Sequence, residues 1–279
     1  MPPTLALTAL TMLAFAGNSV LCRLALSHTA IDPAGFTLVR IASGAAMLWV
    51  LANLVGRRKG IGGSWTGALA LTLYAVAFSL AYVTLPAGTG ALLLFGAVQV
   101  TMIATGLKQG ERLALAQWAG LAIALAGLVA LVAPGVSAPQ PLGAALMALS
   151  GVAWGVYSLL GRGIKDPVAA TAGNFLRAVP MALVPAAILA GHLNPDPQGI
   201  LYAVLSGTLA SGCGYILWYH VLPRLGAAQG ASVQLSVPAI AALAGSAVMG
   251  EALTLRLGVA SAAVLGGIAL VIARRQRQS

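Results

Sequence analysis

The chain is a succession of long apolar stretches separated by short polar connections. Each stretch is long enough for a helix to cross the hydrocarbon core of a bilayer, which takes about 20 residues. Gly, Pro, Asn and Asp mark the connections, as is typical of turns. Because a backbone inside a bilayer must satisfy its own hydrogen bonds, these stretches are expected to be helices. We therefore predict ten transmembrane helices, at 4–26, 34–55, 65–84, 87–106, 115–133, 142–161, 169–190, 199–221, 226–249 and 255–273.

Composition narrows the fold class further. Hydrophobic residues make up 59% of the chain and charged residues only 7%, whereas a soluble domain has about 25% charged residues. So few charges cannot cover a water-exposed surface, and a chain this apolar is not disordered. The first stretch has the small-x-small form Ala14-Phe15-Ala16 of a signal peptide, but no Lys or Arg precedes it, so we expect a mature helix. We predict an all-α integral membrane protein without a soluble domain.

The positive charges indicate an orientation. The net charge of +10 could suggest a nucleic-acid partner, but the charges lie at the ends of apolar stretches, without interleaved surface aromatics. The connections after the second, fourth, sixth and eighth stretches and the C-terminal tail hold eleven Lys and Arg, and the other connections hold none. The positive-inside rule then places both termini in the cytoplasm. We expect a multi-pass protein of the bacterial inner membrane, a monomer that binds no nucleic acid.

Two halves of the chain share a pattern. Residues Glu111-Arg112-Leu113-Ala114-Leu115 return 140 residues later as Glu251-Ala252-Leu253-Thr254-Leu255, and Asp32-Pro33 before Arg40 returns as Asp166-Pro167 before Arg177. Each half holds five stretches, an odd number, so the second half must enter the membrane from the opposite side. We expect two inverted five-helix repeats, 1–137 and 138–279. Transporters that work by alternating access are built this way, with the substrate site near the midplane between the repeats.

The same residues resemble the drug/metabolite transporter superfamily, specifically its ten-span EamA-type members. The resemblance covers nearly the whole chain. The first helix of each repeat carries Phe15-Ala16-Gly17-Asn18-Ser19 or Trp154-Gly155-Val156-Tyr157-Ser158, and Arg40 or Arg177 lies early in the second helix. Pro238 precedes Gly250-Glu251 with the family spacing. The first repeat departs from the pattern, with Val98 in place of the Pro and Ala16 in place of the Trp.

The resemblance implies that the first, third and fourth helices of each repeat surround a central cavity. Within the superfamily the chain is most similar to amino-acid exporters, which favours aromatic amino acids or related small metabolites as substrates. A solute of this kind needs polar and aromatic groups that face a cavity rather than lipid. Our candidate substrate-binding residues are Asn18, Tyr74, Phe78, Tyr82, Gln99, Trp154, Tyr157, Ser158, Ser211, Tyr215, Trp218 and Gln234.

Other roles compete for several of these positions. Tyr82, Trp218 and Tyr219 lie near the ends of their stretches and could belong to an interfacial aromatic belt. Asn18, Gln99 and Gln234 could instead form hydrogen bonds between helices.

The charged residues suggest mainly structural roles. Arg40 and Arg177 could hold a substrate carboxylate, but their places near helix ends favour snorkelling or pairing with backbone carbonyls. Glu111 and Glu251 each stand just before a helix, where a carboxylate caps free amides. All acids and His residues lie at or near the ends of spans, so a buried proton-coupling carboxylate is not expected. We therefore predict facilitated export or exchange.

Small residues predict where helices pack closely. Gly120, Ala124 and Gly127 form one such patch on the fifth helix, and Gly258, Ala262 and Gly266 another on the last.

The alternatives to an amino-acid exporter are a multidrug or nucleotide-sugar carrier of the same superfamily and, less favoured, a channel. No H-E-x-x-H, no Gly-x-Ser-x-Gly with a nearby His and no nucleotide loop occurs, so we expect no enzyme activity. We expect neither a cofactor nor a metal ion. The partners are a small-molecule substrate and the lipid bilayer.

Overall fold

The computed structural model describes residues 2–54, 62–110, 112–161, 164–188, 193–218, 220–221, 225 and 233–275, and these contain no strand. Glu111 and Tyr219 lie outside them. The helices are α1 (Pro2–His28), α2 (Pro33–Leu54), α3 (Trp65–Tyr82), α4 (Ala87–Lys108), α5 (Leu115–Val132), α6 (Pro141–Leu160), α7 (Pro167–Ile188), α8 (Pro197–Leu205), the π-helix η2 (Ser206–Cys213), α10 (Ser236–Met249) and α11 (Leu255–Arg275).

The described part of the chain confirms an all-helical membrane protein. It contains nine helices long and apolar enough to cross a bilayer, and one of them combines α8 and η2 as Pro197–Trp218. The tenth apolar helix, Ser236–Met249, is shorter, and residues 226–232 of the predicted ninth span lie outside the described residues. The other observed bounds agree with the predicted ones to within three residues.

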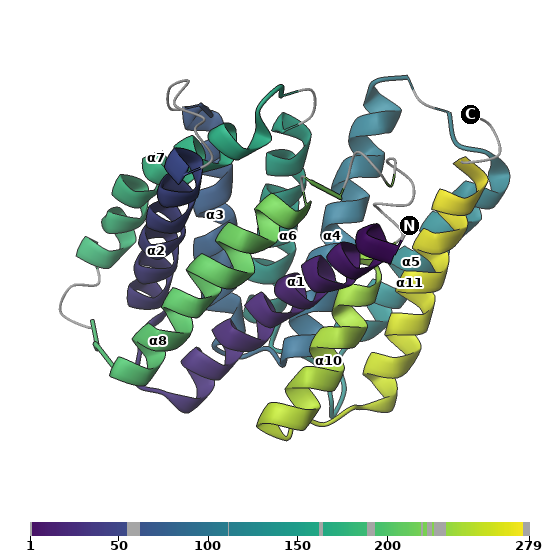
Figure 1. The fold of residues 1–279 in the computed structure, drawn as a ribbon. Coiled ribbons are helices and arrows are strands. Elements are labelled where there is room, and N and C mark those ends of the chain that lie inside the picture. The colour runs from purple at the N-terminus through teal and green to yellow at the C-terminus, as the bar shows by residue number, and fades with distance from the viewer. Residues whose placement is uncertain are drawn as a thin grey trace.

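The connections between helices gather at two ends of the bundle (Figure 1). We call one end the Glu251 end; it holds residues 29–32, 83–86, 133–140, 193–196 and 250–254. The opposite end, the Lys165 end, holds residues 62–64, 112–114 and 164–166. Asp32 and Asp166 begin α2 and α7 in the same way, since each carboxylate accepts the backbone N–H three residues on.

The helices of the two halves pack reciprocally. The helix α6 lies against α3 and α4, and in the same way α1 lies against α8 and α10. The helix α2 packs along α7, and α5 along α11. The first helix of each half therefore packs against helices of the other half, and both halves contribute to the centre of the bundle (Figure 1).

The eighth span differs from a regular α-helix. Residues Ser206–Cys213 form a π-helix between α8 and the helical residues 214–218. Its glycines let α2 approach closely: a Cβ at Gly207 would overlap the Arg40 carbonyl and the Ser43 hydroxyl. A π-helical turn inside an α-helix is often found at functional sites, and this one packs against α1 and α2 at the bundle centre.

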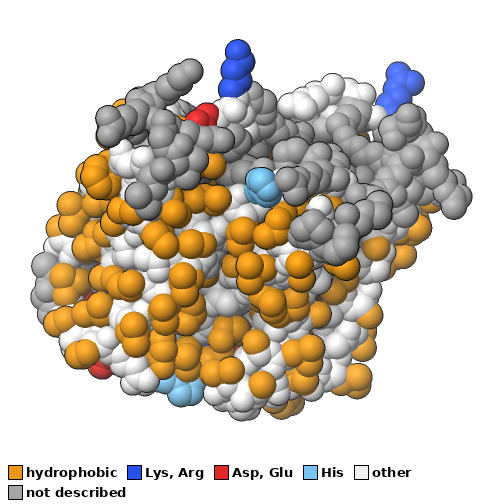
Figure 2. Space-filling view, in the orientation of Figure 1, with side chains coloured by type: hydrophobic (Ala, Val, Ile, Leu, Met, Phe, Trp, Pro, Cys, Tyr) orange, Lys and Arg blue, Asp and Glu red, His pale blue; other side chains and the backbone are white. Residues whose placement is uncertain are grey.

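The bundle surface has the pattern of a membrane protein. Apolar side chains cover its sides, while the visible Lys and Arg side chains project from the upper end in Figure 2. Trp49, Trp65 and Trp118 are 56%, 61% and 48% exposed, and all lie within two turns of a helix end near the Lys165 end. This is the position of an interfacial aromatic belt. Tyr82 and Trp218 are buried, so they do not belong to such a belt.

The helices α5 and α11 pack closely along each other. A Cβ on Gly120 would meet the backbone of Gly267, and one on Gly127 would meet Ala263 and Val264. The predicted patch on the fifth helix therefore packs as expected. On the last helix the predicted face was wrong, because Gly258 and Gly266 have no neighbouring atom at the Cβ position. The packed face carries Gly267, one residue further on.

Candidate functional site

A small cavity lies at the centre of the bundle, where α1, α3, α4, α6 and the eighth span meet. Its free volume is about 20 Å³, enough for one water molecule. It is lined by Phe15, Asn18, Ser19, Tyr74, Phe78, Leu94, Phe95, Trp154, Ala210 and Tyr215.

Aromatic rings form most of the wall of this central pocket. Trp154 is the hub: its ring centre lies 4.9 Å from that of Tyr74 and 5.1 Å from that of Tyr215. Phe78 packs on Tyr74 at 5.3 Å, and Phe15 packs edge-on against Tyr215 at 6.1 Å. Tilted and edge-to-face contacts of this kind are favourable for aromatic pairs. The wall suits a flat apolar group.

A chain of polar side chains runs beside the aromatic wall. Arg40 Nη2 donates to the Tyr74 hydroxyl at 3.0 Å, and Asn18 Nδ2 donates to the same hydroxyl at 3.1 Å. The Ser206 hydroxyl donates to Asn18 Oδ1 at 2.6 Å. All four side chains are buried, and they come from α2, α3, α1 and η2. The network therefore fixes Asn18 and Tyr74 at the pocket and ties the π-helix to it.

A larger pocket opens at the Lys165 end, with a volume of about 560 Å³. The beginnings of α3 and α7 and the end of α6 line it. Asn174 holds two of these elements together, because its Oδ1 accepts from the Ser64 backbone at 2.8 Å and its Nδ2 donates to the Tyr157 hydroxyl at 3.5 Å. Tyr157 also stacks on Trp154, with ring centres 5.4 Å apart and planes at 29°. Because Tyr157 lines the larger pocket and Trp154 the central one, this stacked pair contacts both pockets.

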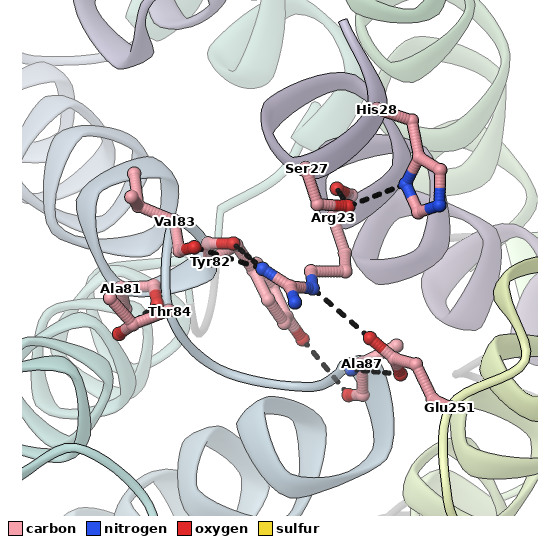
Figure 3. Close-up of polar contacts among 9 residues, drawn as sticks. All are labelled: Arg23, Ser27, His28, Ala81, Tyr82, Val83, Thr84, Ala87 and Glu251. Atoms are coloured by element: carbon pink, nitrogen blue, oxygen red, sulfur yellow. Dashed lines mark hydrogen bonds and ion pairs between the residues drawn. The ribbon is translucent and has the colours of Figure 1, made fainter.

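An ion pair joins the two halves at the Glu251 end (Figure 3). Arg23 Nε donates to Glu251 Oε1 at 3.0 Å, and Arg23 Nη1 donates to the carbonyls of Tyr82 and Val83. The second carboxylate oxygen of Glu251 accepts the Ala87 N–H at 2.7 Å. One ion pair therefore joins α1, the α3–α4 connection and the α10–α11 connection.

The role predicted for Glu251 needs a correction. Glu251 was expected to cap the helix that follows it, but its carboxylate instead caps α4, whose first residue is Ala87. Gly250 makes this possible, because its φ of 66° is left-handed and ends α10 with a sharp turn. Glu111, its counterpart in the first half, lies outside the described residues.

Five of the candidate residues meet at the central pocket: Asn18, Tyr74, Phe78, Trp154 and Tyr215. Tyr157 lines the larger pocket instead. The remaining six, which line neither pocket, are Tyr82, Gln99, Ser158, Ser211, Trp218 and Gln234.

Several of those six have other contacts. Ser158 donates back to the Trp154 carbonyl, Tyr82 donates to the Ala87 carbonyl beside the ion pair, and the Trp218 ring packs on Phe15. Gln99 is buried in α4, and Gln234 is half-buried just before α10. A part for these residues in substrate binding stays a prediction.

Sequence reasoning missed five residues of the pocket wall: Phe15, Ser19, Leu94, Phe95 and Ala210. Phe15 and Ser19 lie one turn apart, on either side of Asn18, so helical spacing alone could have placed them on its face. Leu94, Phe95 and Ala210 carry no signal that separates them from the many other apolar residues of their helices.

The two arginines that follow an Asp-Pro pair in the two halves, Arg40 and Arg177, have different surroundings. Arg177 Nη1 donates to the carbonyls of Gly62 and Gly173 at 2.6 and 3.0 Å, as expected. Arg40 does not snorkel, because it is 2% exposed, and within the described residues it donates to the Tyr74 hydroxyl rather than to a carbonyl. Here the expectation was wrong.

Comparison with known proteins agrees with this architecture. Residues 141–273 match the EamA-like transporter family. An uncharacterized transporter of Archaeoglobus fulgidus is 28% identical over 97% of this chain and 98% of its own. The chain belongs to the EamA-like transporter family. It is therefore a membrane transporter, as predicted.

Other relatives of this EamA-like transporter extend the comparison. An uncharacterized protein of Pseudomonas aeruginosa, PA1977, is 58% identical over 98% of this chain and 95% of its own. A protein of Streptantibioticus cattleyicolor named "Probable terminal-alkyne amino-acid exporter" is 27% identical over 78% of this chain and 76% of its own. A crystal structure with 21% identity shares the fold, with a TM-score of 0.70 over 98% of this chain and 97% of that one.

Proposed function

We propose that this transporter exports amino acids, with aromatic ones favoured, by alternating access to the central pocket. The observation that carries the proposal is the pocket itself, in which the Trp154, Tyr74 and Tyr215 rings stand beside the buried amide of Asn18. Rings accept a flat apolar side chain, and buried polar groups orient the backbone end of the same molecule. The relative named as an amino-acid exporter supports this substrate class.

The chain direction supports two inverted repeats. The helix α1 runs from the Lys165 end to the Glu251 end, and α6, its counterpart, runs the opposite way (Figure 1). The reciprocal packing of α6 on α3 and α4 and of α1 on α8 and α10 is the contact pattern that such a symmetry requires. A transporter with this architecture exposes its site alternately by rocking one unit against the other.

The two ends differ in a way that suits export. The positive charges favour the Lys165 end as cytoplasmic, and the larger pocket opens there. The Arg23–Glu251 pair closes the opposite end. A substrate from the cytoplasm would therefore enter the larger pocket and reach the central one when the stacked Trp154 and Tyr157 rings separate. Because the central pocket now has room for about one water, binding also requires its wall to move.

The carboxylates favour facilitated export or exchange over proton antiport. Those of the described residues, Asp32, Asp166, Asp196 and Glu251, lie in the connections at the two ends of the bundle. None stands in the middle of a span, where a proton-coupling acid would be needed.

The test is counterflow into proteoliposomes loaded with unlabelled amino acid. We expect saturable uptake of labelled phenylalanine, tyrosine or tryptophan without an imposed pH gradient. Excess unlabelled aromatic amino acid should compete, and cationic dyes and sugar nucleotides should not. Competition by dyes or sugar nucleotides alone would instead support a multidrug or nucleotide-sugar carrier. Flux that requires a pH gradient would contradict facilitated transport.

A further inference from the structure

Arg40 is a buried cation with an unused donor. Its side chain starts on α2 and ends over the rings of Tyr74 and Phe78, with the guanidinium carbon 5.2 and 4.9 Å from the two ring centres. Nη2 donates to the Tyr74 hydroxyl, but Nη1 is fully enclosed and has no hydrogen-bond partner among the described residues. Two aromatic faces stabilise a cation only in part. A buried charge normally has a counter-charge, because leaving water is costly.

The described carboxylates are all engaged elsewhere. Asp32, Asp166 and Asp196 accept the N–H groups of helix starts, and Glu251 pairs with Arg23. The fifth acid of the chain, Glu111, lies outside the described residues. Within the described part of the chain, Arg40 thus has no carboxylate partner.

The groups around Arg40 are also rich in donors and poor in acceptors. The Tyr74 hydroxyl oxygen accepts from both Arg40 and Asn18, and the Asn18 carbonyl oxygen is used by Ser206. The hydroxyl of Ser211, buried on the π-helix that packs against α2, has no hydrogen-bond partner in the described part of the chain. An anion would supply the acceptors and the negative charge that this region lacks.

We propose that Arg40 binds the carboxylate of the substrate. This inference rests on the proposed function, because it takes the central pocket as the substrate site, and it names the chemical class: an aromatic compound with a carboxylate. Tyr74 and Phe78 line the pocket, and the guanidinium of Arg40 lies over both of their rings. When these rings move to admit a substrate, the carboxylate reaches Nη1 of Arg40, and the substrate ring packs against Trp154 and Tyr215.

The equivalent Arg177 provides an internal contrast. Its Nη1 already has two carbonyl acceptors, and its guanidinium lies 5.9 Å from the ring centre of the exposed Trp65. Arg177 therefore holds its helix to the Lys165 end, and it needs no ligand. The two arginines therefore have different roles: Arg177 stabilises the structure in one half, and Arg40 binds substrate in the other.

The experiment measures the melting-temperature shift that four compounds produce in the purified protein: phenylalanine, 3-phenylpropionate, phenylalaninamide and phenethylamine. The first two carry a carboxylate and the last two do not. A ligand that binds only the folded state raises the melting temperature according to its affinity. The variants are Arg40→Gln, Arg40→Lys and, as the matched control, Arg177→Gln.

We expect the wild type to bind the two carboxylates about 10- to 100-fold more tightly than the other two compounds, the range for losing one charge-assisted contact. Arg40→Gln should bring this ratio to about one. Arg40→Lys should give an intermediate ratio, because an ammonium keeps the positive charge but cannot form a bidentate contact with a carboxylate. Arg177→Gln should keep the wild-type ratio even if its melting temperature falls.

The outcomes separate the two proposals. An unchanged ratio in Arg40→Gln, or no preference in the wild type, would overturn the role of Arg40 and leave an aromatic amino-acid exporter in place. An Arg40-dependent preference for 3-phenylpropionate without binding of phenylalanine would support Arg40 and reject amino acids as substrates. If the wild type bound none of the four compounds, both proposals would be rejected. If Arg40→Gln did not fold, the ratio in Arg40→Lys would decide.

Discussion

Removing the charge of Glu251 should open the pocket from the Glu251 end. The Glu251→Gln variant keeps an oxygen for the Ala87 N–H and loses the ionic bond to Arg23. The two side chains are only 14% and 19% exposed, so the pair is worth more than a surface ion pair. A hydrogen bond between charged groups contributes about 1.5–3 kcal/mol. We take about 2 kcal/mol as the amount by which the closed state loses stability.

This loss of stability predicts a measurable population of the state that is open at the Glu251 end. A shift of about 2 kcal/mol changes the ratio of open to closed molecules about 30-fold. If the state open at the Glu251 end makes up about 1% of the wild type, it should rise to about a quarter of the variant. Arg23→Gln should act in the same direction, because it removes the other partner of the pair.

The assay is the labelling rate of a single cysteine in the pocket wall. Ser19 lines the central pocket and is 1% exposed, and the natural Cys22 and Cys213 are first replaced by Ser. A membrane-impermeant maleimide added outside intact cells should label Ser19→Cys about 10- to 30-fold faster when Glu251→Gln is present. Asp196→Asn is the control, since this carboxylate at the same end accepts a local N–H, that of Gly199. Equal labelling rates with and without the Glu251 and Arg23 changes would refute this reasoning.

Two further predictions concern packing and the pocket wall. Gly267→Leu should lower the melting temperature by an amount equal to about 1–3 kcal/mol of overpacking, because its Cβ would lie 2.7 Å from the Ala124 nitrogen. Gly266→Leu should have little effect, because nothing lies near that Cβ. Equal melting temperatures for the two variants would contradict the α5–α11 contact. Trp154→Ala should reduce counterflow of aromatic amino acids about tenfold or more, since such a ring contact is worth about 0.5–1.5 kcal/mol beyond its buried area. Trp49→Ala, at the exposed belt, should transport normally. Full activity of Trp154→Ala would exclude the central pocket as the site.

The helices could be predicted from sequence because one constraint dominates. A backbone in lipid must form its own hydrogen bonds, so a long apolar stretch has few alternatives to a helix. The π-helix at Ser206–Cys213 could not be predicted this way, because hydropathy does not show to which carbonyl each backbone N–H donates its hydrogen bond. The packed face of α11 was missed by one residue, since small residues occur at both Gly266 and Gly267 and only the approach of α5 selects one.

The pocket was partly predictable for a related reason. Asn18, Tyr74 and Trp154 stand out because polar and aromatic groups at membrane depth are unusual, whereas Leu94 resembles its apolar neighbours. Arg40 was misjudged because its position near a helix start suggests snorkelling. Only the structure shows that α3 and η2 enclose it and that the described acids are engaged elsewhere.

Sided labelling of Arg112→Cys and Ala252→Cys tests the central claim most directly. The two positions correspond in the two halves, 140 residues apart, and both are exposed in the structure. With the native cysteines replaced by Ser, an impermeant maleimide outside intact cells should label Ala252→Cys, and Arg112→Cys should react only after the membrane is permeabilised. Labelling of both positions from the same side would contradict two oppositely inserted halves around a shared site.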